Sequence, residues 1–476
     1  MAAQILNTKQ ILANSGVQFG TSGARGLVVD FTSDVCAAFT AAFINVMKVG
    51  YQFNKIAIAI DNRPSSYAMA QACSAAAEQL DIEVIYYGVL PTPGLAYAAM
   101  QQSIPCIMVT GSHIPFDRNG LKFYRPDGEI SKQDELAILN VNASFFQIDT
   151  IKELDLDNSA TELYVKRYTS LYSNKPLLGK RIGIYEHSSA GRDLYAQVFE
   201  QLGAEVISLE RTNTFVPIDT EAVSEQDCQK AINWSKEFNL DAIFSTDGDG
   251  DRPLLADENG TWLRGDILGL LCASQLEIQA LAVPVSCNTA IELSQYFSTV
   301  TRTRIGSPYV IAAFEPLSKQ YLSVAGFEAN GGFILGSDVS LNNTLINSLP
   351  TRDALLPAIV VLVAAQKSSL VDLVSSLPRR VTASDRIKDF ATSRSIAIIE
   401  QGQQNPQTLL ERLGFQQETI AKLDSTDGLR MTLSNQDIIH LRPSGNAPEL
   451  RCYAESRTEE TAKNYVLQVL DKVTSI

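Results

Sequence analysis

Three alternating aspartates carry the most specific chemical signal of this sequence. Asp247, Asp249 and Asp251 alternate with glycines in STDGDGDRPLL, residues 245–255, between two segments that we predict to be strands. Three carboxylates this close repel one another strongly unless a divalent cation lies among them. The spacing therefore predicts a site for a hard, oxygen-preferring ion such as Mg²⁺, with a phosphate oxygen as a further ligand.

Two other interpretations fit the aspartates less well. A surface turn could have the same composition. An EF-hand loop is a second alternative, because Glu258 falls at position twelve of such a loop. The segment departs from that motif at position six, where Arg252 replaces the glycine, and at its flanks, which read as strands rather than helices.

A serine follows another predicted strand. Ser112 lies in VTGSHIPFDRNGLKFY, residues 109–124, and a hydroxyl at the carboxyl end of a strand can accept and pass on a phosphoryl group. Lys122 could neutralise a phosphate or take a proton. His113 suggests a Ser–His hydrolase, but adjacent side chains rarely point at each other and the sequence has no GxSxG elbow here. A plain hairpin turn at Asn119-Gly120 is the remaining alternative.

Two glycine-containing loops offer groups for a sugar and an anion. Glu328 and Asn330 project from GFEANGGFILGS, residues 326–337, and such a pair can bond to vicinal sugar hydroxyls. In FGTSGARG, residues 19–26, the glycines permit close backbone approach to a ligand and Arg25 adds a positive charge. A glycine-rich hairpin is the alternative for the first loop, and a flexible glycine-rich turn for the second.

A basic loop near the end of the sequence could cradle a phosphate. HLRPSGNAPELRCY, residues 440–453, combines planar arginine forks with the backbone N–H groups of a tight loop. An ordinary turn with two solvated arginines is the alternative. The candidate residues are Arg442, Ser444, Gly445, Asn446 and Arg451.

Composition narrows the class of protein. The net charge is −14, which repels nucleic acid and anionic membranes, so we expect neither as a partner. We find neither an apolar run of membrane-spanning length nor a signal-peptide pattern, and we expect a cytoplasmic protein. Seven scattered cysteines without a CxxC pair and only three histidines argue against disulfides and against a zinc enzyme.

Alternating strands and helices must position these loops. The order indicates βαβ units with largely parallel sheets, repeated loosely three times. The expected strands are 55–60, 83–87, 106–110, 181–185, 241–246 and 283–287, with helices at 33–48, 65–80 and 288–297 and a PTPG turn at 91–94.

The last hundred residues differ from the repeated pattern. Strands at 428–433, 437–442 and 449–455 precede a helix at 458–473, which predicts a smaller α+β domain. At 476 residues the chain is too long for one core. We predict four domains: 1–154, 155–257, 258–372 and 373–476.

Taken together and in this order, the loops resemble the α-D-phosphohexomutase superfamily, in particular its phosphomannomutase/phosphoglucomutase branch. VTGSHIPFDRNGLK resembles the family's phosphoserine loop, and TDGDGDR its metal loop. GFEANGG stands where the family has its sugar-specificity loop, and RPSGNAPELR where it has its phosphate-binding loop. The resemblance covers nearly the whole chain.

The resemblance implies a fold and a set of roles. Three similar mixed α/β domains and a smaller C-terminal α+β domain would surround a central cleft. Ser112 would carry the phosphoryl group and join the three aspartates at one Mg²⁺. Lys122, a candidate for proton transfer, would act with Arg25 and His113 at the reacting oxygens. The implied substrate-binding residues are Arg252, Glu328, Asn330, Arg442, Ser444, Gly445, Asn446 and Arg451.

The implied reaction interconverts hexose 6-phosphate and hexose 1-phosphate through phosphoserine and a bisphosphorylated sugar, with a sugar bisphosphate as activator. The partner is then a small phosphosugar, and the enzyme a monomer or homodimer. Ala329-Asn330-Gly331 keeps a glucosamine- or acetylglucosamine-phosphate mutase open, and Ile114-Pro115, Asn446-Ala447 and Ser307-Pro308 also depart from the family's usual residues. A non-catalytic phosphosugar-binding protein is the third alternative.

Overall fold

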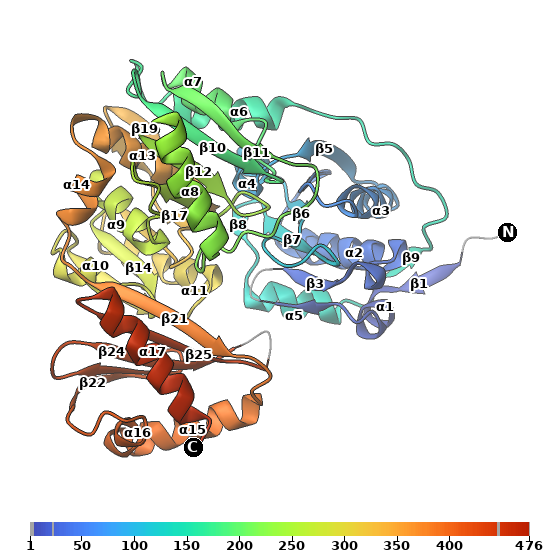
Figure 1. Cartoon of the computed structure of the whole chain (residues 1–476). Helices are drawn as coiled ribbons and strands as arrows, with labels where there is room; N and C mark the ends of the chain where they lie inside the picture. Colours follow the sequence, from blue (N-terminus) through green and yellow to red (C-terminus); the bar gives the residue numbers. More distant parts are fainter. Residues whose placement is uncertain (1–3, 21–22, 445–447, 476) are drawn as a thin grey trace.

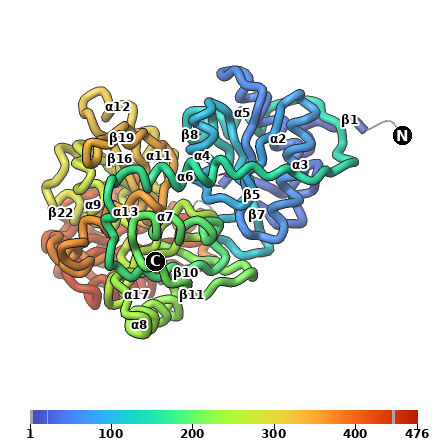
Figure 2. The backbone as a smooth tube through the Cα atoms, turned by 90° about the horizontal axis from the view of Figure 1, so that it is seen from above, coloured from blue at the N-terminus to red at the C-terminus, as the bar shows by residue number. Residues whose placement is uncertain are grey.

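The strands of the protein form four main sheets that follow one another along the chain (Figure 1). This computed structural model describes residues 4–20, 23–444 and 448–475. Each main sheet lies within one of the four predicted ranges, although the boundaries themselves stay predictions. Figure 2 shows the first unit as a lobe beside the other three.

The first unit shows how the sequence pattern produces buried strands. In β4 (Lys55–Ile60), Ile56 and Ile58 face a core with α2 (Ser33–Gly50) and α3 (Ser66–Glu78). The alternating Ala57 and Ala59 face a second core on the opposite side of the sheet, with α4 (Thr92–Gln101). Both faces are covered, so the strand reads as a continuous apolar run. The other elements are β1 (Ile5–Asn7), α1 (Thr8–Asn14), β2 (Gln18–Phe19), β3 (Ala24–Leu27), β5 (Glu83–Val89), α4 (Thr92–Gln101), β6 (Cys106–Val109), β7 (Arg118–Arg125), β8 (Gly128–Glu129), α5 (Lys132–Asn140) and β9 (Ser144–Phe146).

The second and third units contain sheets of four and five strands. The second comprises α6 (Ser159–Thr169), β10 (Arg181–His187), α7 (Tyr195–Gln201), β11 (Glu205–Arg211), α8 (Glu225–Phe238), β12 (Ala242–Thr246) and β13 (Pro253–Ala256). The third comprises α9 (Gly265–Gln275), β14 (Ala280–Pro284), α10 (Ala290–Leu293), β15 (Thr299–Thr303), α11 (Ser307–Ala312), α12 (Phe314–Ser318), β16 (Val324–Phe327), β17 (Phe333–Leu335), β18 (Val339–Leu341), β19 (Thr344–Ile346), β20 (Leu349–Asp353), α13 (Leu355–Ala364) and α14 (Leu370–Ser375).

One strand arrangement recurs in all three units. Three neighbouring strands run parallel, and a fourth returns antiparallel beside the third: β5-β4-β6-β7, β11-β10-β12-β13 and β15-β14-β16-β17. In each unit the third parallel strand leads directly into a turn and the antiparallel strand. The prediction of three similar mixed α/β domains is therefore confirmed.

Three predicted elements need correction. The PTPG segment begins α4 instead of forming a separate turn, because prolines suit a helix start, where N–H groups have no helical acceptor. The strand expected at 283–287 is β14, which lies earlier and ends at Pro284. Of the helix expected at 288–297, only α10 is formed.

The last unit is an antiparallel sheet with helices, as predicted. Its elements are β21 (Val381–Ile387), α15 (Thr392–Gln404), α16 (Pro406–Arg412), β22 (Ile420–Asp424), β23 (Leu429–Leu433), β24 (Ile438–Pro443), β25 (Leu450–Ser456) and α17 (Glu459–Val473). It is joined to the third unit where the Glu455 carboxylate accepts a hydrogen bond from the Thr289 N–H, at 3.0 Å. Among the described helices, none combines the length and apolarity needed to cross a bilayer.

Candidate active site

The three repeated sheets present three polar loops at the same topological place, the turn after the third parallel strand. We call them the serine loop (110–117), the aspartate loop (247–252) and the glutamate loop (328–332). Ligands of such sheets collect at the carboxyl ends of the strands. The serine and aspartate loops touch, since a Cβ on Gly248 would lie 2.7 Å from the Ser112 carbonyl oxygen.

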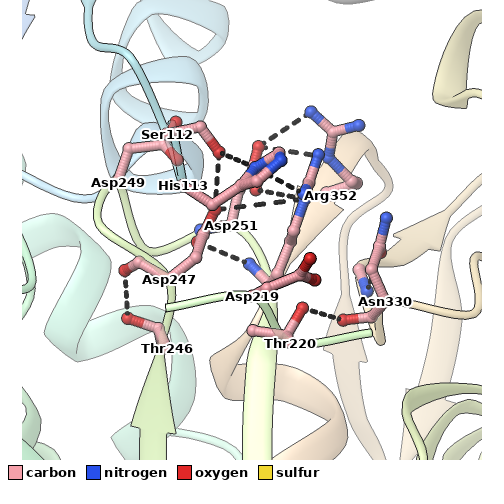
Figure 3. A network of polar contacts seen from close by, with 12 residues as sticks. Ser112, His113, Asp219, Thr220, Thr246, Asp247, Asp249, Asp251, Asn330 and Arg352 are labelled. Atoms are coloured by element: carbon pink, nitrogen blue, oxygen red, sulfur yellow. Dashed lines mark hydrogen bonds and ion pairs between the residues drawn. The ribbon is translucent and has the colours of Figure 1, made fainter. Parts of the chain in front are cut away.

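Ser112 is buried and held in a fixed orientation. Its Oγ donates to Asp247 Oδ2 at 2.7 Å, across the boundary between the first two units (Figure 3). Its N–H donates to Thr110 Oγ1 at 2.8 Å. Its φ of +53° is in the left-handed region, which non-glycine residues adopt rarely and which is found at functional sites. The structure thus aims one hydroxyl at the aspartate loop.

The three aspartates form a compact, fully buried cluster. One carboxylate oxygen from each lies within 4.8 Å of the others. Oδ2 of Asp249 accepts from Thr92 Oγ1 at 2.7 Å and from Lys122 Nζ at 2.5 Å, while Oδ2 of Asp251 accepts from Lys122 at 2.7 Å. Among the described residues, Oδ1 of Asp249 and Oδ1 of Asp251 have no hydrogen-bond partner.

These unbonded oxygens fit a divalent metal ion. Buried carboxylate oxygens normally have partners, and hard cations prefer such oxygens. Burial, followed by the adjacent carboxylates of Asp249 and Asp251, raises the pKa of Asp247 well above its usual value. A divalent cation among the three would offset that repulsion. The cluster can therefore hold a metal.

Basic side chains surround the same cluster. Arg252 Nη1 donates to His113 Nδ1 at 2.9 Å, and its Nε lies 3.6 Å from Asp251 Oδ1. Burial and the Arg252 charge lower the pKa of His113 to about 2, so the ring is neutral. Burial and the same neighbour lower the pKa of Arg25 to about 10. Because His113 Nδ1 accepts from Arg252 and lies 3.4 Å from Ser112 Oγ, the geometry is not that of a serine–histidine dyad.

The glutamate loop reaches the cluster through an arginine that sequence reasoning missed. Arg352, at the end of β20, donates to Asp251 Oδ2 at 2.9 Å (Figure 3). It also donates to Glu328 Oε2 at 3.1 Å. Asn330 is held from the second unit, since Thr220 Oγ1 donates to its carbonyl oxygen at 2.8 Å.

Opposite charges lie close together in this centre, where four carboxylates meet four basic side chains. The carboxylates are Asp247, Asp249, Asp251 and Glu328, and the cations are Arg25, Lys122, Arg252 and Arg352.

A second arginine that the sequence did not single out supports the serine loop. The Arg63 side chain is buried, and its Nε donates to Asp61 Oδ2 at 3.1 Å. Its guanidinium carbon lies 3.8 Å from the centre of the Phe215 ring of the second unit. The remaining donors bond to the carbonyl oxygens of Ser112, Ile114, Pro115 and Arg118 at 3.0, 2.5, 2.8 and 2.9 Å. The position of Asp61 at the end of the predicted strand 55–60 is the signal that could have indicated this pair.

The predicted phosphate-binding residues lie in the last unit. Arg442 and Ser444 line a cavity of about 420 Å³ together with Arg304 and Tyr309 of the third unit. Arg451 lines a different cavity of about 350 Å³, although it faces Arg442 across the β24–β25 pair. Gly445 and Asn446 lie outside the described residues.

The chain matches models of one protein family over most of its length. The matches are to phosphoglucomutase/phosphomannomutase alpha/beta/alpha domain I at residues 16–147, alpha/beta/alpha domain II at 162–260, and the C-terminal domain at 381–472. The chain belongs to this family, within the α-D-phosphohexomutase superfamily. It is accordingly an enzyme of the isomerase class, a phosphohexomutase.

Relatives and solved structures agree with this assignment. The chain is 58% identical to a phosphomannomutase of Salmonella muenchen, over 99% of this chain and 98% of the relative. It is 41% identical to a phosphomannomutase of Sinorhizobium fredii, over 96% and 98%. A phosphoglucomutase/phosphomannomutase family protein of Burkholderia thailandensis has the same fold, with a TM-score of 0.75, 17% identity, and coverage of 96% and 97%. So does an Aspergillus fumigatus N-acetylphosphoglucosamine mutase, solved with GlcNAc-6P and magnesium, with a TM-score of 0.61, 12% identity, and coverage of 98% and 99%.

Proposed function

We propose that this chain is a phosphomannomutase/phosphoglucomutase that interconverts hexose 6-phosphate and hexose 1-phosphate through a phosphoserine. The observation that carries the proposal is the 2.7 Å hydrogen bond from Ser112 Oγ to Asp247 Oδ2. It places one buried hydroxyl against a carboxylate cluster that can hold a metal. A phosphoryl group on that hydroxyl would meet the basic side chains of the same centre.

In the first half-reaction, the free hydroxyl of the hexose monophosphate attacks the phosphorus of phospho-Ser112. The bond from phosphorus to Ser112 Oγ breaks as the bond to the sugar oxygen forms. Lys122 is our candidate for proton transfer: its ammonium group would give a proton to the leaving Ser112 Oγ, and the resulting amine would take the proton of the attacking sugar hydroxyl. The product is a hexose bisphosphate and free Ser112.

In the second half-reaction, the bisphosphate turns end for end and its other phosphate returns to Ser112. Positioning and charge neutralisation supply most of the catalysis in phosphoryl transfer of this kind. Arg25 and Arg252 would neutralise the transferring group, with His113 beside them. A sugar bisphosphate from solution would phosphorylate the resting serine and so activate the enzyme.

Three aspartates and a phosphoserine oxygen would hold Mg²⁺. When bound, such an ion withdraws charge from the transferring phosphoryl group. The unbonded oxygens of Asp249 and Asp251 support this assignment. So does the oxygen-only character of the donor set.

The remaining predicted residues would bind the part of the sugar that does not react. Glu328 and Asn330 would accept and donate hydrogen bonds to ring hydroxyls. The phosphate that is not being transferred would lie in the basic loop of the last unit, held by Arg442, Ser444, Gly445, Asn446 and Arg451. Arg442 and Ser444 share a cavity with Arg304 there, in which Arg442 is paired with Asp427 at 2.8 Å, and a phosphate would replace that carboxylate as its partner.

The names of the relatives favour mannose phosphates as the substrates of this chain, because the 58% and 41% identical proteins are both named phosphomannomutase. The test is a coupled assay with mannose, glucose, glucosamine and N-acetylglucosamine 6-phosphates, comparing kcat/KM. We expect the mannose and glucose compounds to be turned over best. A preference for either amino sugar would reject the proposal in favour of a hexosamine-phosphate mutase.

Replacement of Ser112 tests the chemistry in the same assay. Ser112→Ala should abolish interconversion while the thermal unfolding midpoint is kept. Ser144→Ala, an exposed serine of β9 in the same unit, is the matched control and should retain full activity. Turnover by the Ser112→Ala protein at the wild-type rate would show that the phosphoryl group is carried elsewhere.

A further inference from the structure

Arg352 is the largest fully buried side chain in the described part of the chain, with 2% of its surface exposed. It lies at the end of β20, outside every motif that the sequence analysis singled out. An arginine is almost never buried this completely unless its charge is paired. Its partners therefore indicate what it is there to do.

The guanidinium joins two loops that belong to different units. Its Nε and Nη2 donate to Asp251 Oδ2 at 3.1 and 2.9 Å (Figure 3). Its Nη1 donates to Glu328 Oε2 at 3.1 Å. The planar fork presents donors along two edges, so it can fix two carboxylates at a set angle. A lysine ammonium is a point charge and cannot do this.

The backbone around Arg352 is anchored on both sides. Thr351 Oγ1 donates to Glu129 Oε1 of the first unit at 2.9 Å. Asp353 accepts from Tyr164 at 3.0 Å and from Tyr168 at 2.5 Å. These contacts hold the backbone on either side of Arg352, and its own bonds to Asp251 and Glu328 orient the guanidinium.

The Arg352 guanidinium determines which carboxylate oxygen of Asp251 remains available for a metal. Arg352 and Lys122 both bond to Oδ2 of Asp251, which leaves Oδ1 without a hydrogen bond in the described structure. Oδ1, which has Arg252 Nε at 3.6 Å but accepts no hydrogen bond from a described residue, is then the atom offered to a metal. On the other side, the same guanidinium fixes the Glu328 carboxylate, the group that would contact sugar hydroxyls.

We propose that Arg352 is a positioning residue that couples the metal site to the sugar site, so that Mg²⁺ and hexose phosphate bind cooperatively. The inference rests on the proposed function, because it takes Asp251 as a metal ligand and Glu328 as a sugar contact. By thermodynamic linkage, the sugar must strengthen Mg²⁺ binding by the same factor by which Mg²⁺ strengthens sugar binding.

Calorimetric titration of the dephosphorylated protein measures this coupling without turnover. The dissociation constant of Mg²⁺ is determined with and without saturating mannose 6-phosphate, in wild type, Arg352→Lys and Arg352→Gln. We expect a wild-type ratio of roughly 5–150, the usual range for coupled sites. Both variants should bring the ratio close to one, and Glu328→Gln should do the same.

A second buried arginine provides the matched control. Arg167 is 6% exposed, donates to the Asn347 carbonyl oxygen at 2.8 Å, and stacks on Tyr97. Arg167→Lys should keep the wild-type ratio, because Arg167 lies near the Tyr168–Asp353 pair but has no described contact with Asp251 or Glu328. If Arg352→Gln fails to fold, Arg352→Lys carries the test, since it retains the charge and most of the volume.

The outcomes separate this inference from the proposed function. A wild-type protein that binds neither Mg²⁺ nor mannose 6-phosphate contradicts the proposed function. A wild-type protein that binds both independently, or an Arg352→Lys protein with the wild-type ratio, overturns only the coupling by Arg352. In the latter case the ion and the phosphosugar would interact directly.

Discussion

Removal of the Arg63 side chain should remove the hydrogen bonds that hold the serine loop in its conformation. The guanidinium supplies hydrogen bonds to four carbonyl oxygens of the segment that carries Ser112. It also pairs with the buried carboxylate of Asp61. Arg63→Met keeps the apolar length of the side chain, so the substitution mainly deletes these polar contacts.

The magnitude follows from what is left unpaired. Removing one partner of a buried ion pair costs about 3–5 kcal/mol, because the other charge stays buried and uncompensated. For a unit of 150–250 residues, each kcal/mol shifts the unfolding midpoint by roughly 2–4 °C. Arg63→Met should thus lower the midpoint for the first unit by roughly 6–20 °C. Arg181→Met, which removes a half-exposed arginine paired with Glu205, should cost less than about 1 kcal/mol.

Two assays follow the substitution. Calorimetry gives the unfolding midpoints. Intact-mass measurement after incubation with a sugar bisphosphate gives the rate of phosphorylation of Ser112, which we expect to fall at least tenfold at a temperature where the variant is folded. The role of Arg63 in holding the loop would be refuted by two results together. The Arg63→Met protein would have an unfolding midpoint as high as that of the Arg181→Met protein, and Ser112 in it would be phosphorylated at the wild-type rate.

Three further predictions concern the glutamate loop, the metal and the pH dependence of stability. Gly265→Ala should raise KM for the hexose phosphate more than it lowers kcat. The added Cβ would lie 2.2 Å from the Gly331 nitrogen and would displace the glutamate loop. An unchanged KM would contradict this effect of the contact. Chelation should abolish activity, and Mg²⁺ should restore it; full activity in chelator would contradict a metal at the aspartates. Burial lowers the pKa of His440 from 6.5 to about 4, so the unfolded chain takes up a proton first as pH falls. As the pH falls from about 6.5 to about 4, protonation of this group should lower the free energy of unfolding by up to about 3 kcal/mol. The drop in the unfolding midpoint from about pH 7 to about pH 4.5 should be smaller in His440→Gln, and an equal drop would show that the ring does not titrate in this way.

Much of the central site could be predicted from local sequence. Each reactive loop follows a short apolar strand, and the carboxyl ends of parallel strands are where ligand groups gather. That reasoning makes each loop a candidate site, and the family resemblance places Ser112 beside the aspartate cluster; their contact in the structure agrees with that placement. Three strands and the final helix of the last unit were likewise predicted closely, because their apolar spacing is regular. The sequence analysis did not anticipate β21, α15, α16 and β22.

The supporting arginines could not be predicted in this way. The carbonyl oxygens that Arg63 bonds to lie 49–55 residues further along the chain, and Asp251 lies 101 residues from Arg352. Such partners are set by how the units pack on one another, which leaves no local spacing to detect. The PTPG segment shows the opposite problem, since prolines mark both turns and helix starts.

Phosphate transfer from the protein tests the central claim most directly. The enzyme is incubated with hexose 1,6-bisphosphate carrying labelled phosphate, freed of sugar, and mixed with unlabelled mannose 6-phosphate in a rapid-quench experiment. Our account predicts that label first resides on the peptide containing Ser112 and then passes to the sugar no more slowly than kcat. Label on another residue, or transfer too slow to support turnover, would contradict it.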